Sequence, residues 1–280
     1  MAAHRAQSCR AAELLHCNQS SVSRSAKKCQ EIFGVSLVKK SSEWIVQGDE
    51  VLLSAERKVH QAYRWEEGLP LRLDAQHWHR DFYGSLKLEG WLLGNLNYLE
   101  YERPAYLIEN RIIDAWLCSA PDTPRGSAFR SIQLTSMPVY LCVKGGHPLE
   151  ALGSQVTIED VRRYPLLPLP ERAFPVFSEQ LRKLGLGSSA NPLASQINGS
   201  TEAIEDLLVG IANPMTLKLY GPDAVVLPIK LPIAVGDVLT VHADFWGHPR
   251  MRELLDSLTP RLQRLSEQVE DIEVLGVAVS

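Results

Sequence analysis

Apolar residues in the early part of the chain recur at helical spacing. A short helix is expected at Arg10–His16. Asn18 should then cap a second helix, because its side chain can accept a bond from a backbone N–H that lacks a helical partner. One buried stripe is expected along that helix at spacing i, i+4, i+7 and i+11: Val22, Ala26, Cys29 and Phe33. Gly34 follows, where a helix commonly ends in a left-handed residue.

Two apolar runs, Leu37–Val38 and Trp44–Val46, flank a polar turn at Lys39–Glu43 and predict a small two-stranded wing. A third, longer helix should run from Asp49 to about Glu67. A seam near heptad spacing follows it: Leu52, Ala55, Val59, Ala62 and Glu66. Such a seam suits helix–helix pairing between subunits.

After Leu71, short apolar runs alternate with amphipathic segments, which predicts a mostly parallel sheet covered by helices. Strands are expected at Leu71–Ala75, Tyr106–Ile108, Ala115–Cys118, Val139–Val143 and Leu239–His242. Helices are expected at Asp81–Leu99, Thr157–Arg163, Val176–Leu184, Thr201–Val209 and Pro249–Leu258. Leu166–Pro170 should be an extended loop, because prolines bound it.

Composition narrows the class of protein. The 280 residues are 45% hydrophobic and 22% charged, as in a globular protein, and no apolar run is long enough to span a bilayer. Met1–Gln7 is polar and lacks the apolar region of a secretory signal. Five cysteines stand at irregular spacing, which suits reduced thiols: Cys9, Cys17, Cys29, Cys118 and Cys142. We therefore expect a cytoplasmic protein without a membrane partner.

Charge is distributed unevenly along the chain. The net charge is −4, but residues 1–40 hold seven Lys or Arg against two Glu, so the head carries +5 and the remainder −9. A basic head on an acidic body is typical of proteins in which only the head meets phosphate. A basic surface helix arising by chance stays open as the alternative.

Several motifs occur together in one order. They are Arg10 to Arg24 with its double alanine and Val22-Ser23-Arg24, then Gly34-Val35-Ser36-Leu37, Arg111 to Leu117, Gly146-His147-Pro148-Leu149, and Glu205 to Gly210. With these motifs the chain resembles the LysR-type transcriptional regulators, from Arg10 to near Leu258. Each fragment is weak alone, but their shared order makes the resemblance specific.

The resemblance implies an α/β fold class with an N-terminal winged helix-turn-helix, a linker helix, and a two-lobed effector domain like that of periplasmic binding proteins. The implied boundaries are 1–48 for the DNA-binding domain, 49–68 for the linker helix, 69–265 for the effector domain and 266–280 for a tail. Lobe I would comprise 71–138 and 239–265, and lobe II 139–238. The implied partners are double-stranded DNA, a small-molecule effector and a second copy of the chain in a dimer or tetramer. No cofactor is implied.

The head departs from the family pattern. Only Met1–Cys9 precede the double alanine, so the family's first helix is expected to be short. Cys29, Val38 and Lys40 stand where the family usually has Leu, Phe and Arg. Either the true start lies upstream of Met1, which we favour, or the head is degenerate. A DNA-binding-impaired small-molecule sensor, or a solute-binding protein of the same fold, is therefore the alternative function.

The second helix carries the candidate DNA-reading residues opposite its Val22 stripe. They are Gln19, Ser20, Ser23, Arg24 and Lys27. A recognition helix needs one packed side and one side that fits the major groove. Gln19 can bond to adenine, and Arg24 to guanine or a phosphate. Lys27 and Lys40 are expected to hold phosphates. An ordinary surface helix with its polar residues outward is the alternative.

Effector residues are implied at the ends of strands, where open α/β sheets bind ligands. By family position they are Gln76, His77, Ser119, Ser200 and Thr201. Solvated loop groups or simple helix caps are the alternative for each.

Other chemistry finds little support. His77-Trp78-His79 would place two rings on one face of a strand without an obvious third metal ligand, and the cysteines near His16 match no zinc spacing. Cys118 and Cys142 end apolar runs and should be buried. No nucleophile elbow, P-loop or dinucleotide fingerprint is present, so we expect neither a metal site nor an enzyme.

Overall fold

The computed structural model describes residues 12–13, 16–40, 43–84, 86–94, 98–99, 102–169, 172–187 and 206–276. The chain divides into two compact units, residues 1–63 and 64–280, and each is described by itself. Within the described ranges no helix is both long and apolar enough to cross a membrane.

The first unit is built from a helix, a hairpin and a second helix. Its elements are α2 (Gln19–Phe33), β1 (Val35–Lys40), β2 (Glu43–Gly48) and α3 (Val51–Glu66), the last continuing into the second unit. As predicted, Asn18 caps α2 by accepting a bond from the backbone N–H of Ser21. Gly34 ends the helix at φ 66°, in the left-handed region that glycine adopts without strain.

The prediction of one buried stripe along α2 is wrong, because no residue of this helix is buried, and Cys29 departs furthest from it. Its side chain is exposed, whereas Val22, Ala26 and Phe33 are half-buried. Helical spacing places the four on one face, but burial also needs an element that covers each of them. Nothing in the described part of the chain covers Cys29.

The wing is an antiparallel hairpin, as predicted, with strands longer than expected. Val35 pairs with Gly48 and Lys40 with Glu43. Lys39, Lys40 and Glu43 therefore belong to strands and not to the predicted turn. Polar residues are compatible with both, because a two-stranded hairpin can expose most of its side chains.

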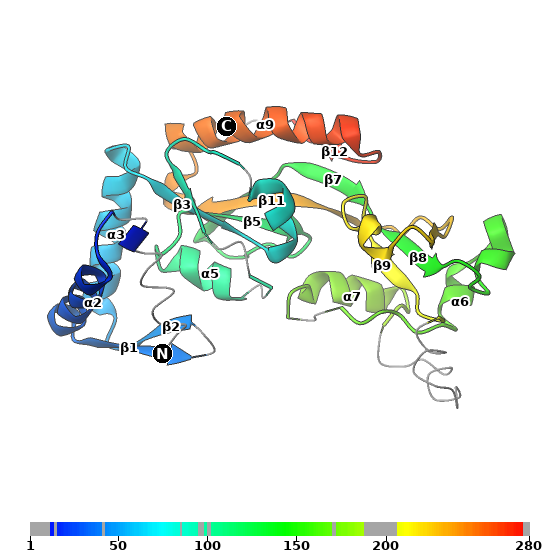
Figure 1. Cartoon of the computed structure of the whole chain (residues 1–280), viewed down its shortest axis with the longest axis horizontal. Coiled ribbons are helices and arrows are strands. Elements are labelled where there is room, and N and C mark those ends of the chain that lie inside the picture. Colours follow the sequence, from blue (N-terminus) through cyan, green and yellow to red (C-terminus); the bar gives the residue numbers. More distant parts are fainter. Residues whose placement is uncertain are drawn as a thin grey trace. The chain divides into compact units, whose positions relative to one another are not determined.

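The second unit holds two sheets with helices around them (Figure 1). Its strands are β3 (Leu71–Ala75), β4 (Trp91–Leu93), β5 (Ala115–Ala120), β6 (Phe129–Gln133), β7 (Thr135–Pro138), β8 (Tyr140–Lys144), β9 (Gly210–Ala212), β10 (Ala224–Val226), β11 (Ala234–His242) and β12 (Glu273–Val274). Its helices are α4 (Arg80–Tyr83), α5 (Glu102–Glu109), α6 (Ile158–Val161), α7 (Pro175–Lys183) and α9 (Pro249–Gln268). Short 3-10 turns are η1 (His77–His79), η2 (Glu150–Gln155), η3 (Leu217–Tyr220) and η4 (Ala243–Phe245).

The larger sheet is mixed, and the prediction of a mostly parallel sheet is wrong. Its strand order is β12-β7-β11-β5-β3-β4, with β6 also paired to β11. Only β3 pairs in parallel, with β4 and with β5, while β11 runs antiparallel to its three partners. In the chain β11 follows β10 of the smaller sheet and runs back into the larger sheet, in the direction opposite to β5.

The smaller sheet has the order β10-β8-β9, and both pairs are antiparallel. Each sheet has its own core. Leu141, Val143, Phe177 and Leu181 belong to a cluster around β8 and α7, and Trp116 and Ile108 to a second cluster between β5 and α5. Two separate cores give the unit two lobes.

Two predicted elements between residues 80 and 110 are wrong. Helix Asp81–Leu99 is only α4, followed by β4, because glycines such as Gly84, Gly90 and Gly94 interrupt it. Strand Tyr106–Ile108 lies in α5, since a short apolar run fits either a strand or a helix.

Three further boundaries differ. The predicted helix Thr201–Val209 does not reach Val209, because Asp206–Leu207 is a turn and Val209 a β-bridge; its first residues lie outside the described ranges. Helix α9 continues through Pro260 to Gln268, because its apolar stripe continues with buried Leu262. In the predicted tail, Glu273–Val274 pairs with β7.

Candidate functional site

One face of α2 is polar and open to solvent. Its exposed residues are Ser20, Ser23, Arg24 and Lys27, with Gln19 half-buried. Asn18 Oδ1 accepts bonds from Ser21 N at 2.9 Å and from Ser20 Oγ at 2.7 Å, which fixes the first turn. Arg24 Nε donates to the Ser20 carbonyl at 3.2 Å, so the guanidinium lies along the helix. The face combines hydroxyls, an amide and cations, the groups that contact base edges and phosphates.

Two predicted phosphate contacts are also exposed. Lys27 Nζ lies 3.9 Å from a Glu31 carboxylate oxygen, at the edge of ion-pair distance. Lys40 ends β1 and is exposed. Exposed pairs of this kind contribute little to stability, so Lys27 can exchange its partner for a phosphate at small cost.

In the second unit, two of the predicted effector residues line a cavity at the carboxyl ends of β3 and β5. His77 and Ser119 are among its lining residues, and Gln76 is not. Gln76 is fully buried, and its Oε1 accepts a bond from Ser119 N at 3.0 Å. Gln76 therefore positions the strand end that carries Ser119. Ser200 and Thr201 lie outside the described residues.

The cavity has a volume of about 650 Å³ and is mainly apolar. Its apolar walls include residues of both core clusters, such as Phe177 and Ala120. The apolar lining residues are Phe82, Ala120, Val139, Leu167, Leu169, Phe174, Phe177, Ile211, Ala212, Met215, Leu219 and Val235. Its polar lining residues are His77, Ser119, Asn213, Thr216, Lys218 and Tyr220. Apolar walls with a few polar groups are typical of small-molecule sites.

Three of these polar side chains, those of Tyr220, Asn213 and Thr216, are bonded to the protein's own backbone. The Tyr220 hydroxyl donates to Ile211 O at 2.8 Å and accepts from Ile211 N at 3.1 Å. Burial is the main cause that raises the pKa of this phenol. Asn213 Oδ1 accepts from the backbone N–H groups of Met215 and Thr216, at 2.9 and 3.0 Å. These bonds fix the loop between β9 and η3.

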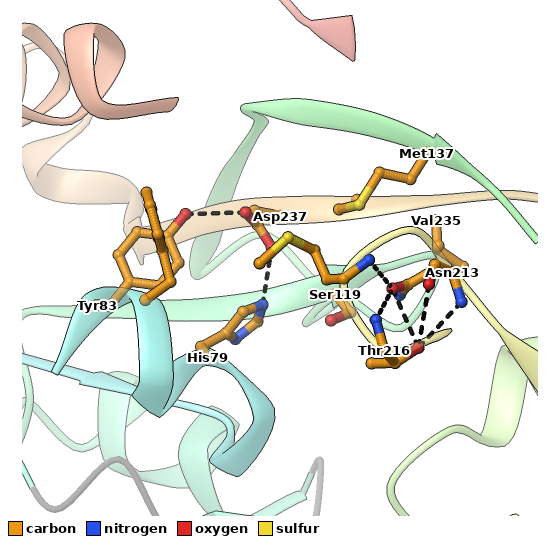
Figure 2. Close-up of a pocket in the computed structure, with 11 residues that line it drawn as sticks. His79, Tyr83, Ser119, Met137, Asn213, Thr216, Val235 and Asp237 are labelled. Atoms are coloured by element: carbon orange, nitrogen blue, oxygen red, sulfur yellow. Dashed lines mark hydrogen bonds and ion pairs between the residues drawn. The ribbon is translucent and has the colours of Figure 1, made fainter. Parts of the chain in front are cut away.

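A small annex of about 40 Å³ shares Ser119, Asn213 and Val235, among other residues, with the cavity (Figure 2). In it, Asp237 bonds to His79 Nε2 and accepts from the Tyr83 hydroxyl, both at 2.9 Å. Burial first, and the Asp237 charge second, raise the pKa of Tyr83 well above its usual value.

Neither Asp237 nor Tyr83 was predicted as a site residue from the sequence. A signal existed, because a carboxylate inside the apolar run of β11 needs a partner if it is buried.

Asp122 joins the segment after β5 to α7, whose Phe177 lines the cavity. The carboxylate is buried and accepts from Val176 N at 2.6 Å and Phe177 N at 3.1 Å, at the start of the helix. Burial raises the pKa of Asp122, and the two N–H bonds oppose this shift. Asp122 was not predicted from the sequence either, since its partners on α7 lie more than fifty positions away.

The histidines considered as metal ligands, His77 and His79, do not lie on a strand. His77–His79 forms a 3-10 turn and not a strand, and His79 is bonded to Asp237. The described residues include no group of three His, Cys, Asp or Glu side chains that could hold a metal ion. Cys118 and Cys142 are buried as predicted, and burial raises their pKa to about 12 and about 11.

Comparisons with known proteins agree with this architecture. The family model of the LysR substrate binding domain matches residues 95–263. Full-length OxyR from Pseudomonas aeruginosa, a cysteine-to-aspartate variant, is 19% identical, with 92% of this chain and 94% of that chain covered and a TM-score of 0.55. A reduced form of OxyR from N. meningitidis is 13% identical, with 74% and 99% covered and a TM-score of 0.50. No curated protein sequence matches the chain. At these identities the two structures share the fold.

Proposed function

The chain belongs to the LysR family of transcriptional regulators, and on that premise we propose that it is a sequence-specific DNA-binding regulator. A small-molecule effector bound in the cavity would modulate its activity. The proposal includes a homodimer or tetramer, a cytoplasmic location and no enzymatic activity. It keeps the subdivision into 1–48, 49–68, 69–265 and 266–280, with lobe I at 71–138 and 239–265 and lobe II at 139–238.

The observation that carries the DNA-binding proposal is the exposed polar face of α2. Ser20, Ser23 and Arg24 are exposed on a capped helix that a hairpin follows directly. In a winged helix-turn-helix the second helix enters the major groove with such residues toward the bases. Gln19 is assigned the same role, and Lys27 and Lys40 the phosphates.

The effector proposal is supported by the cavity at the carboxyl ends of β3 and β5. His77 and Ser119 line it, and Gln76 acts behind Ser119. Ser200 and Thr201 stay proposed effector residues on family position alone. A ligand that contacts walls from both lobes would favour one arrangement of the lobes over others.

The test of DNA reading begins with a duplex selected by the intact chain from a randomised pool. Arg24→Ala should weaken binding of that duplex by about 1–3 kcal/mol, which raises the Kd about 5-fold to 150-fold, at matched salt. Arg252→Ala, at an exposed position of α9, is the matched control and should leave the Kd unchanged.

A gel shift with selected and scrambled duplexes separates the roles. The variants Lys27→Ala and Lys40→Ala should each weaken binding of the selected and the scrambled duplex alike. They should also reduce the dependence of the Kd on salt concentration. If the intact chain selects no duplex, or if Arg24→Ala binds as the natural chain does, the DNA-reading assignment is wrong. A chain without salt-dependent DNA binding would instead be the effector sensor that the sequence left as the alternative.

A further inference from the structure

We propose that the cavity takes a mainly apolar molecule that carries one anionic group, bound with the anionic end at the cavity mouth beside Lys218. The inference rests on the proposed function, because it names the chemical class of the effector.

The walls select an apolar body. Phe82, Phe174 and Phe177 present rings to a cavity of about 650 Å³, and leucine, valine and methionine side chains complete the walls. An apolar ligand surface gains free energy when it is removed from water. A strongly polar ligand would lose its hydration here without replacement bonds.

The polar lining offers donors to a ligand and few acceptors. The Tyr220 hydroxyl both donates to and accepts from Ile211, so mainly its ring faces a ligand. The Thr216 hydroxyl accepts from Asn213 N at 3.0 Å and lies 3.1 Å from Asn213 Oδ1 as donor. Because Asn213 Oδ1 accepts from two backbone N–H groups as well, its NH₂ is the part left for a ligand.

Lys218 is the cation of this lining. It is exposed, so it stands at the mouth, and its ammonium forms no ion pair with a described residue. No carboxylate is among the described residues that line the cavity. His77, also exposed, adds a ring N–H donor at the mouth. An anion at the mouth is therefore attracted and meets no like charge from these residues.

The annex sets the direction of the ligand. Asp237 lies there, only 7% exposed, and a second anion beside it would be repelled. An organic cation would be attracted by the Asp237 charge, but each Asp237 oxygen already has a partner, in His79 and in Tyr83. A cation would also meet Lys218 on entry. The arrangement favours an apolar body inside and a negative end outside.

Two dyes with one body test the inference on the intact chain. The first is 8-anilinonaphthalene-1-sulfonate, and the second is N-phenyl-1-naphthylamine, which lacks the sulfonate. Both should gain fluorescence on binding, and the sulfonate should bind more tightly. Lys218→Met should raise the Kd of the sulfonate dye by about fivefold, the scale of one partly exposed ion pair, and leave the Kd of the neutral dye unchanged. Lys230→Met, an exposed lysine outside the lining, is the control and should affect neither dye.

A second variant keeps the test independent of folding. Leu219 lines the mouth and is 72% exposed, so Leu219→Glu adds a carboxylate there without disturbing a core. This variant should weaken binding of the sulfonate dye more than binding of the neutral dye. The control is Leu152→Glu, at a position 41% exposed and outside the lining, which should weaken binding of neither dye. The proposal is overturned if the natural chain binds the two dyes equally, or if the variants weaken binding of both dyes equally. It is also overturned if neither Lys218→Met nor Leu219→Glu changes the Kd of the sulfonate dye. These outcomes do not depend on DNA, so a failed gel shift and a failed dye experiment remain distinguishable.

Discussion

His147 is held in one protonation state by two bonds of opposite kind. Its Nδ1 accepts from Leu149 N at 3.1 Å, and its Nε2 lies 3.3 Å from Leu207 O, which requires the proton on Nε2. Protonation of Nδ1 would remove the acceptor that Leu149 uses. Burial is the main cause that lowers the pKa of His147, and the bond to Leu207 opposes the shift without cancelling it.

This lowered pKa predicts a pH dependence of stability. Above the ordinary histidine pKa of about 6.5 both states are neutral, so His147 adds no slope. Below it the unfolded state takes up the proton first, so the free energy of unfolding falls as the pH decreases toward the folded pKa. Urea unfolding of the natural chain and of His147→Asn should show a difference that is constant above about pH 6.5 and shrinks below it. Parallel curves down to pH 5 would contradict this account.

Three residues of the family motifs in the second unit, Asp114, His147 and Gly210, hold the scaffold. Asp114 is fully buried and accepts from Arg64 at 2.9 and 3.2 Å and from Arg72 N at 2.8 Å. His147 closes a turn, and Gly210 makes room for the ring of Tyr220. Sequence pattern reveals such residues because backbone geometry restricts what can replace them. Lys218 and Asn213 had no such restriction and no motif, so sequence reasoning did not find them.

At the scale of elements, β9 packs closely against η3 because Gly210 of β9 has no side chain. A Cβ on Gly210 would overlap the Tyr220 ring and stand 2.9 Å from Cys142 Sγ. Gly210→Ala should therefore lower the free energy of unfolding by about 1–3 kcal/mol, as overpacking does.

The control is Gly247→Ala, because a Cβ there meets nothing within 4 Å. It should change stability by less than about 0.5 kcal/mol in urea unfolding. Tyr220→Leu added to Gly210→Ala should recover part of the loss if the ring is the cause. A Gly210→Ala chain as stable as the natural one would show that the loop moves freely.

Helix α3 leaves part of its predicted seam open to solvent. Leu52 is 63% exposed and Val59 70% exposed, and Val51 and Tyr63 are exposed as well. At the other end of the helix Trp65 is fully buried, stacked on Phe245 with ring centroids 4.7 Å apart. An anchored helix with an apolar exposed row suits pairing with a second copy.

Val59→Glu should then shift the chain toward the monomer, because it places two carboxylates in the paired seam. Light scattering across a dilution series measures the change. The control is Lys58→Glu, at the neighbouring exposed position. It changes the charge by more than Val59→Glu does, and it should leave the oligomer intact. A monomer in the natural chain, or equal effects of the two variants, would contradict pairing through this seam.

Elements with caps or long periodicity were predictable, and short ones were not. Asn18 and Gly34 mark the ends of α2, and Thr157 caps α6 with a box completed by Asp160. In contrast, β4 and α5 are short apolar segments whose state depends on partners distant in sequence. The antiparallel direction of β11 likewise follows from the path of the whole chain, which no local pattern records.

At the scale of the whole molecule, the two units carry the two halves of the proposed function. Residues 1–63 present the polar face of α2, and residues 64–280 enclose the cavity. Helix α3 belongs to both, since it begins at Val51 and ends at Glu66. Its last turn is bonded into the effector unit through Arg64 and Asp114. Ligand-dependent DNA binding requires that the two units influence each other across this helix.

The most direct test is a titration of the selected duplex, labelled at both ends for energy transfer, with and without a ligand found by thermal shift. Energy transfer reports both the Kd and the bend of the DNA. We predict that a stabilising ligand changes the Kd by about fivefold or more, or changes the end-to-end transfer at saturation. The change should be smaller in Leu219→Glu. A ligand that raises the Tm while both the isotherm and the transfer stay the same would contradict the claim that the cavity controls the DNA-binding helix.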